Sequence, residues 1–169
     1  NPPFAYSARA PDNRITRLQK QVDVGEVGLT RDDERGYLES LLAALEVPRE
    51  SQMLVFSKTS LQIRRISPRT PRAIYFRDDV YVGYRQSGDM IEVSAVDPQL
   101  GAVFYTLAQD SSQERPTFER QTHSCLVCHS SSRTGGIPGH LVRSVYAKES
   151  GHPVLSAGTH TVDHTTQLE

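Results

Sequence analysis

Both cysteines of the chain lie in one short stretch, residues 122–130, which reads THSCLVCHS. Cys125 and Cys128 are three positions apart, and His129 directly follows the second cysteine. Two thiols at this spacing, followed by an imidazole, can form a redox disulfide, bind a metal ion or hold a metal-bearing group. All six histidines lie at or beyond His123. We therefore expect the chemistry of the protein in its C-terminal third.

The order Cys-x-x-Cys-His is the attachment pattern of c-type haem. Two intervening residues in a helical turn separate the thiols so that they can add to the two vinyl groups of the porphyrin, and the next residue then directs its imidazole to the iron. The motif predicts one covalently attached haem c, bound through Cys125 and Cys128, with His129 as proximal ligand. The absence of other cysteines fits, because a further thiol in an oxidising compartment can pair wrongly with these two.

Three other chemistries remain open for the two cysteines. A thioredoxin-like redox pair is expected at a strand-to-helix junction in a βαβ unit, whereas this motif follows a polar segment. A zinc site would recruit His140 and His152, whose separation differs from the usual roughly three to five residues. The third alternative is a local disulfide without a cofactor.

The motif resembles that of the c-type cytochromes. A wider set of stretches is similar to a group of poorly characterised exported bacterial monohaem or multihaem proteins: LVFSKTSLQ, YVGYR, DPQLGAVFYTL, CLVCH and PGHLVRSVY. The resemblance implies haem and a periplasmic or extracellular location, with any signal peptide already removed. Members of that group continue beyond a segment like DHTTQLE, so we expect this chain to be a fragment of a longer protein.

Two classes of function follow from a haem. Electron transfer to a redox protein partner is favoured by the surplus of histidines after the motif, which can supply a second iron ligand. A haem enzyme with an open distal site, peroxidase-like or acting on a small ligand, is favoured by a strand-rich region larger than a simple carrier needs. The abrupt termini and His123, which could serve a haem on another chain, favour a third interpretation: a subunit of an oligomer or a larger multihaem complex.

The sixth iron ligand is expected among residues far from the motif in sequence. His164 is the first candidate, because the neighbouring Asp163 can orient an imidazole by a hydrogen bond. His140, beyond a Gly/Pro loop, is the second candidate, and Met90 is a third. For the haem propionates we expect Arg133, because arginine pairs with carboxylates through two hydrogen bonds. Arg143 is a weaker candidate for the same role.

Two further groups of side chains are more simply explained by structure than by chemistry. A basic run is expected to be a solvated turn rather than a docking site for an acidic partner: Arg64, Arg65, Arg69 and Arg72. Several tyrosines are expected to pack in a sheet rather than line a haem pocket: Tyr75, Tyr81, Tyr84 and Tyr105.

The totals for the chain exclude other classes of protein. Its 169 residues carry a formal net charge of −1, which gives no field to attract nucleic acid. No run of about eighteen apolar residues is present, so we expect no transmembrane segment.

Two helices are expected in the N-terminal part, residues 1–50, after an extended arm over residues 1–11. Asp12 is expected to cap the first helix, whose apolar face consists of Ile15, Leu18 and Val22. Thr30 is expected to cap the second. Its apolar stripe should pack in the core: Leu38, Leu41, Leu42 and Leu45.

The middle of the chain, residues 53–108, is expected to hold four to six strands. One or two should lie in residues 53–66, followed by hairpins that turn at Asp78-Asp79 and at residues 97–101. Residues 117–169 form the expected haem-binding part, with a short helix over 117–131, a strand over 140–148 and an irregular tail from Glu149. The chain is thus expected to be a single α+β haem domain, not the common all-α fold of small cytochromes.

Overall fold

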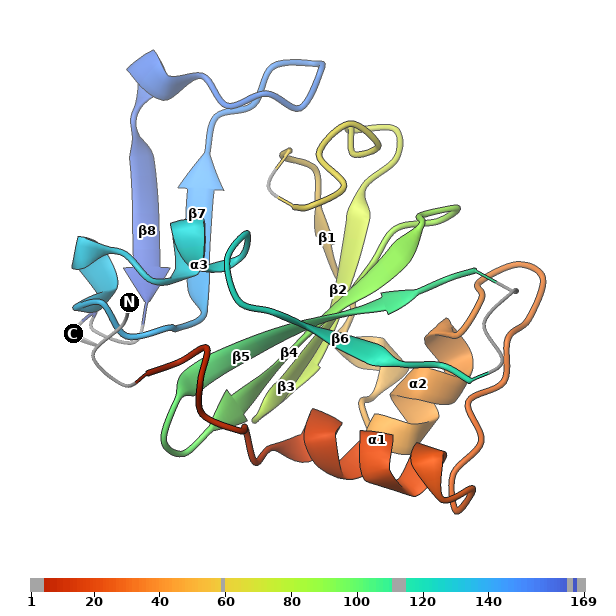
Figure 1. Cartoon of the computed structure of the whole chain (residues 1–169). Helices are drawn as coiled ribbons and strands as arrows, with labels where there is room; N and C mark the ends of the chain where they lie inside the picture. Colours follow the sequence, from red (N-terminus) through yellow and green to blue (C-terminus); the bar gives the residue numbers. More distant parts are fainter. Residues whose placement is uncertain (1–4, 59, 111–114, 164–165, 167–169) are drawn as a thin grey trace.

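The computed structural model describes residues 5–58, 60–110, 115–163 and 166, and it has an α+β fold. Six antiparallel strands form one sheet in the order β1-β2-β3-β4-β5-β6, so that each strand pairs with its neighbours in sequence. Figure 1 shows helices α1 and α2 against one face of this sheet, while α3 and a separate two-stranded ribbon, β7–β8, lie toward the other face. The predicted fold class is therefore confirmed. Within the described residues, no helix is both long and apolar enough to cross a bilayer.

Two hairpins form the centre of the sheet, and both turn where the sequence predicts. Strands β2 (Arg72–Arg77) and β3 (Val80–Tyr84) are joined through Asp78-Asp79. Strands β4 (Met90–Asp97) and β5 (Gly101–Ala108) are joined by a turn in which the Asp97 carboxylate accepts hydrogen bonds from the backbone N–H groups of Gln99 and Leu100, both at 2.9 Å. These local bonds fix the register of β4 and β5.

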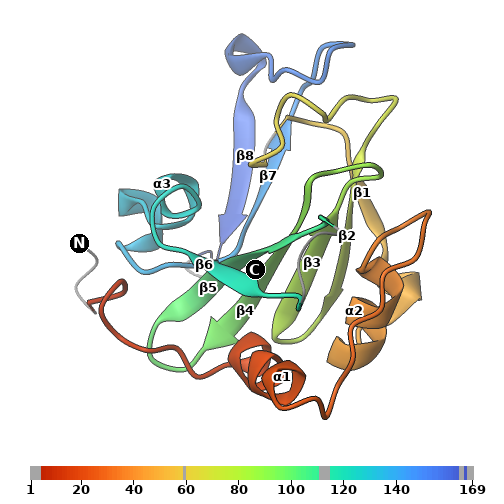
Figure 2. The ribbon, with the colours of Figure 1, turned by 45° about the vertical axis from the view of Figure 1, so that its right-hand side comes forward.

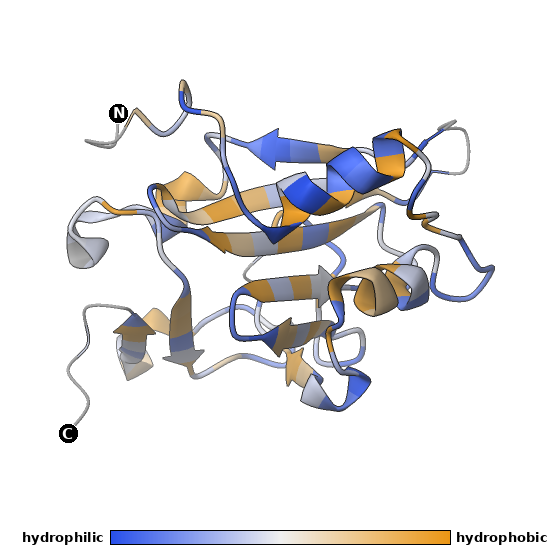
Figure 3. Ribbon diagram, turned by 90° about the horizontal axis from the view of Figure 1, so that it is seen from below, coloured by the Kyte–Doolittle hydropathy of each residue, from blue (hydrophilic) through white to orange (hydrophobic). Residues whose placement is uncertain are grey.

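The two faces of the sheet differ in composition, because successive side chains of a strand point to opposite sides. The face under α1 and α2 carries the apolar core, with Val80, Val82, Val93, Val103 and Leu107 all at most 2% exposed. Figure 3 shows apolar residues concentrated in the central strands and in α2, while α1 has apolar positions among polar ones. The opposite face, called the outer face below, mixes polar and aromatic side chains.

The N-terminal helices form at the expected apolar stripes, but each begins later than predicted. Helix α1 (Arg14–Asp23) is capped by Asn13 instead of Asp12, because the Asn13 side chain accepts hydrogen bonds from the N–H groups of Ile15 and Thr16. Thr16 completes a capping box by accepting from the Asn13 N–H at 3.0 Å. Ile15, Leu18 and Val22 are buried as predicted.

Helix α2 (Leu38–Leu45) begins eight residues after Thr30, so the predicted cap is wrong. The cause is a turn: the Asp32 carboxylate accepts from the N–H groups of Glu34 and Arg35, and Gly36 closes the turn with φ +63°. Acidic residues that suit a helical first turn also suit this turn, because their carboxylates bond nearby N–H groups in both. All four leucines of the predicted stripe are buried.

Several segments differ from the expected pattern along the rest of the chain. Strand β1 (Met53–Val55) is short, and residues 56–58 and 60–71, called loop 56–71 below, form turns and bends instead of a second strand. Residues 118–121 form an edge strand, β6 (Phe118–Gln121), where a helix was expected. The predicted strand after residue 140 is present as β7 (Leu141–Val145), but the tail contains β8 (Thr159–Asp163), which pairs with β7. Short 3-10 turns complete the chain: Arg49–Ser51, Ser132–Thr134 and Leu155–Ala157.

Tyr105 provides a test of the core through its ionisation. It is buried between the sheet and α1, where its hydroxyl accepts a 2.8 Å hydrogen bond from the Asn13 amide, and burial raises the pKa of Tyr105 to about 12. An unfolded tyrosine ionises at a pKa near 10, so as the pH rises the unfolded state loses its phenol proton before the folded state does. The stabilisation from the neutral buried phenol is therefore complete below pH ~10 and is lost as the pH rises to ~12. Two pKa units correspond to roughly 2–3 kcal/mol.

Between pH 10 and pH 12 the free energy of unfolding should fall less in Tyr105→Phe than in the wild type. We expect the difference between the two falls to be roughly 2–3 kcal/mol. Chemical denaturation at a series of pH values measures the difference. Tyr146→Phe is the matched control, because Tyr146 is 70% exposed and should keep the wild-type dependence. Equal slopes for Tyr105→Phe and the wild type would contradict a buried neutral phenol.

Candidate functional site

The cysteine motif forms a short helical turn, α3 (Leu126–His129), that starts at Cys125. The carbonyl of Cys125 accepts hydrogen bonds from the N–H groups of Cys128, at 3.3 Å, and His129, at 3.0 Å. Positions three and four apart lie on the same side of a helix, so Cys125, Cys128 and His129 share one side. Both thiols are free. Val127, from another side of the turn, is 79% exposed.

Strand β6 carries the chain to the outer face of the sheet, where α3 begins. The Gln121 amide donates to the Thr106 hydroxyl on β5 at 3.0 Å, which holds the last residue of β6 to its neighbour. Leu126 packs against the edge of the hydrophobic core. Figure 2 shows α3 beside the β7–β8 ribbon and away from α1 and α2. The motif is therefore attached to the sheet at its first residues and open to solvent at Cys128.

His129 is oriented by two hydrogen bonds to one residue. Its Nδ1 donates to the Gly139 carbonyl at 2.9 Å, and its own carbonyl accepts from the Gly139 N–H at 2.9 Å. The ring also packs against Phe104 on β5, with centroids 4.5 Å apart. Because Nδ1 carries the proton, Nε2 has a lone pair for a metal. Burial lowers the pKa of His129, which favours the neutral imidazole.

These features fit the requirements of a proximal haem ligand. Metal-ligating histidines commonly donate their second ring nitrogen to a backbone carbonyl, which fixes the tautomer and the orientation of the ring. The two cysteines precede the imidazole at the spacing of haem attachment and have no disulfide between them. The residues present can hold the group through Cys125, Cys128 and His129.

Cys125 lacks the properties of an activated thiol. Burial raises its pKa to about 11, and the carboxylate of Glu92 acts in the same direction. Redox-active thiols have lowered pKa values, because the thiolate is the attacking species. All strands of the sheet are also antiparallel, so β6 and α3 belong to no βαβ unit. Neither feature is typical of a thioredoxin-like redox pair.

An ion pair on the outer face lies close to the motif. Arg72 on β2 donates to the Glu92 carboxylate on β4 at 2.6 Å, and both side chains are about 15% exposed. The other Glu92 oxygen accepts from the Leu61 N–H at 2.7 Å, which ties loop 56–71 to the sheet. The Nε of Arg72 is buried without a hydrogen-bond partner.

The two arginines predicted to bind haem propionates follow the motif in the chain. Arg133 is in the 3-10 turn after α3, and its side chain is outside what the structure describes. Arg143 is exposed on β7. Within the basic run, Arg65 pairs with Asp89 at 2.8 Å and Arg72 is turned inward, while Arg64 and Arg69 are solvated as expected. Sequence reasoning missed Arg72 as a site residue because its partner, Glu92, comes from another strand.

The structure describes two of the three distal-ligand candidates, His140 and Met90. His164 lies outside the described residues. The Nε2 of His140 is 2.8 Å from the Ser94 hydroxyl on β4, and its ring packs on Tyr81 at a centroid distance of 4.3 Å. Met90 is half-buried. Residues 90, 92 and 94 of β4 point to the same side of the sheet, so Met90 shares the outer face with the ion pair. His123 is exposed and contacts Thr122.

The tyrosines divide between the two faces of the sheet. Tyr75, Tyr84 and Tyr105 are buried in the hydrophobic core, which confirms the packing role predicted for them. Tyr81 is the exception, because it lies on the outer face and contacts His140.

The described residues contain no group of three or more His, Cys, Asp or Glu side chains that could hold a metal ion. In particular, His152 is exposed and contacts Ser150, so the structure does not bring it to the cysteine pair with His140.

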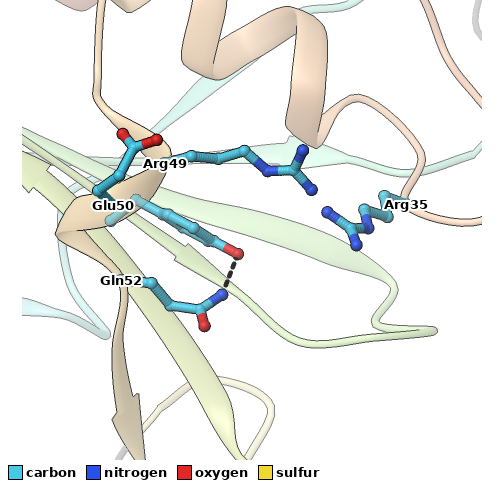
Figure 4. A pocket seen from close by; sticks show the side chains of 5 residues that line it. Arg35, Arg49, Glu50 and Gln52 are labelled. Carbon is cyan, nitrogen blue, oxygen red and sulfur yellow. Dashed lines mark hydrogen bonds between the residues drawn. The ribbon is translucent and has the colours of Figure 1, made fainter.

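An open cavity of about 330 Å³ lies on the helix side of the sheet, away from the motif. Its lining is polar: Arg35, Arg49, Glu50, Gln52 and Tyr75. Figure 4 shows the guanidinium groups of Arg35 and Arg49 directed toward one another. The Gln52 amide donates a hydrogen bond to the Tyr75 hydroxyl. Both arginines also pair with one oxygen of Glu39, at 2.7 and 3.0 Å, so their charge is partly neutralised.

No family model matches the chain, and neither a curated protein nor a solved structure matches it. What the site can do follows from its geometry.

Proposed function

We propose that the protein is a c-type haem protein that transfers electrons, with one haem bound covalently through Cys125 and Cys128 and ligated by His129. The observation that carries the proposal is the hydrogen bond from His129 Nδ1 to the Gly139 carbonyl, within a Cys-x-x-Cys-His turn whose thiols are free. It presents Nε2 on the imidazole that follows the two thiols. When bound, the haem supplies a one-electron iron couple.

Exposed apolar side chains on several elements support the proposal of a large, partly apolar ligand. Exposed apolar side chains come from α3, from both strands of the ribbon and from loop 56–71: Phe56, Leu61, Ile63, Val127, Val142 and Val162. The loop and the ribbon connection adjoin, because the Lys58 N–H donates to the Gly151 carbonyl at 3.1 Å. An isolated two-stranded ribbon is only marginally stable in water, so β7–β8 gains from an apolar group packed beside it.

Electron transfer is favoured over catalysis by the exposure of the motif. Cys128 and Val127 are exposed, so the edge of a group attached there lies at the surface, where a redox partner can approach. Covalent haem attachment also implies export, which places the proposed function in the periplasm or outside the cell. The proposed partners are redox proteins, including other haem-bearing chains.

The first test is an optical spectrum of protein exported by cells that attach c-type haem. We expect a Soret band that stays with the denatured chain, a low-spin spectrum in both oxidation states and no change on adding carbon monoxide to the reduced form. A high-spin spectrum that shifts with carbon monoxide would favour a haem enzyme with an open site. A protein without a Soret band would exclude the haem and favour a redox disulfide or a zinc site at the cysteine pair.

A further inference from the structure

Three consecutive residues after the Gly/Pro loop are each fixed to another part of the molecule. The Pro138 carbonyl accepts from the Ala102 N–H at the start of β5, at 2.8 Å. Gly139 exchanges two hydrogen bonds with His129. The Nε2 of His140 is 2.8 Å from the Ser94 hydroxyl on β4. The Pro138–His140 segment therefore connects the outer face of the sheet to His129.

A glycine on the sheet permits this close approach. Gly101 has φ +74°, and a Cβ at that position would lie 2.2 Å from the Pro138 carbonyl oxygen. Any side chain there would displace backbone, because the atom it meets is not the flexible end of a side chain. The start of β5 is thus shaped to receive the Pro138–His140 segment.

The rings of the two histidines share a support on the sheet. The ring of His140 lies on Tyr81, with centroids 4.3 Å apart, and meets Phe104 edge-on at 6.1 Å. The ring of His129 packs on the same Phe104 at 4.5 Å. Phe104 is 7% exposed and Ser94 is also 7% exposed, so both supports are rigid parts of the sheet.

We infer that His140 is a positioning residue for His129 and not an iron ligand. Its bond to Ser94 and its contact with Tyr81 hold the backbone of residue 139, so that the Gly139 carbonyl points at Nδ1 of His129. This inference rests on the proposed function for its role in a haem protein. The geometry can also be tested without haem.

The expected effect follows from the hydrogen bond between His129 Nδ1 and the Gly139 carbonyl. A carbonyl that accepts from Nδ1 fixes the tautomer with Nε2 unprotonated and makes the imidazole a stronger donor to a metal. Loss of such outer-shell partners typically lowers metal affinity or activity by roughly 10–100-fold. Ser94→Ala removes one anchor of His140 and His140→Ala removes both, while neither changes a residue of the Cys-x-x-Cys-His motif.

The haem-free test uses the chain with Cys125→Ser and Cys128→Ser, in which no haem can attach. Nitrogen NMR of His129, at a pH where its imidazole is neutral, gives the ratio of Nδ1–H to Nε2–H tautomers. We expect the Nδ1–H form to dominate, and the ratio to fall by up to about tenfold in His140→Ala, the factor that the loss of one hydrogen bond gives. His140→Gln should restore it, because the glutamine amide can reach the Ser94 hydroxyl. His152→Ala is the matched control and should change nothing.

The second test uses the haem-loaded protein. A less basic proximal imidazole stabilises ferric iron less, so we expect the reduction potential to rise in Ser94→Ala and His140→Ala and to return toward the wild-type value in His140→Gln. The spectrum of His140→Ala should remain that of the wild type in spin state. A high-spin spectrum that binds carbon monoxide would show that His140 is a ligand, which would overturn the inference.

The two tests separate failure of the inference from failure of the proposed function. An unchanged His129 tautomer ratio in both Ser94→Ala and His140→Ala would overturn the inference whether or not haem is bound. A wild-type chain that never acquires haem would defeat the proposed function and leave the tautomer measurement to decide whether His140 positions His129.

Discussion

Replacing both Cys125 and Cys128 by serine is expected to abolish covalent haem attachment completely. Each thioether needs a cysteine sulfur, and the chain has no other cysteine that can substitute. The fold should survive, because Cys128 is exposed, Cys125 is half-buried and neither belongs to the hydrophobic core. The loss should therefore concern the cofactor and not the sheet.

Haem staining of the denatured chain and its intact mass measure the attachment. The wild type should carry the mass of one haem, and the double variant none. Each single variant should retain at most one thioether. Ser124→Ala is the matched control, since Ser124 is an exposed neighbour of Cys125 within the same stretch. Far-UV circular dichroism should be equal for all variants. Haem that stays covalently bound to the double variant would contradict the assignment of the attachment residues.

Replacing His129 by glycine is expected to change the iron coordination while the two thioether positions remain. The substitution removes the imidazole that the Gly139 carbonyl orients and leaves a space beside Phe104. Free imidazole added to the solution should enter this space and restore the wild-type spectrum, because it supplies the same donor nitrogen. We expect a high-spin spectrum without imidazole and a low-spin spectrum with it.

If cells attach haem poorly to this variant, haem can be added to the purified apoprotein. The optical spectrum is then recorded while imidazole is titrated into the sample. His152→Gly is the control, because His152 is exposed and its imidazole contacts the Ser150 hydroxyl. Its spectrum should match that of the wild type and should not respond to imidazole. A wild-type spectrum in His129→Gly without imidazole would show that another residue is the proximal ligand.

The local features of the fold were predictable because they depend on neighbours in sequence. The stripe from Leu38 to Leu45 forms a helix and buries its apolar face, and the hairpin between β4 and β5 turns at Asp97. The start of α2 was not predictable in the same way. Asp32 can cap a helix or close a turn, and the competing turn ends at Gly36, where a left-handed backbone conformation is easily adopted.

The edge strands were missed for a different reason. Residues 118–121 carry three polar side chains and give little apolar alternation, yet they form β6 because β5 offers an unpaired edge. Strand β8 likewise forms only because β7 pairs with it. A strand that depends on its partner more than on its own composition is weakly marked in a sequence.

The sequence alone determined the Cys-x-x-Cys-His pattern, because the spacing of Cys125, Cys128 and His129 requires only one helical turn. The tertiary structure decided what surrounds that turn. Ser94 and His140 are 46 residues apart, and Arg72 and Glu92 are 20 apart, yet each pair meets on the outer face of the sheet. Strand register and chain reversal bring such residues together, and neither is contained in the spacing of a motif. The chemistry of the turn is therefore local, whereas the orientation of its imidazole is a property of the whole sheet.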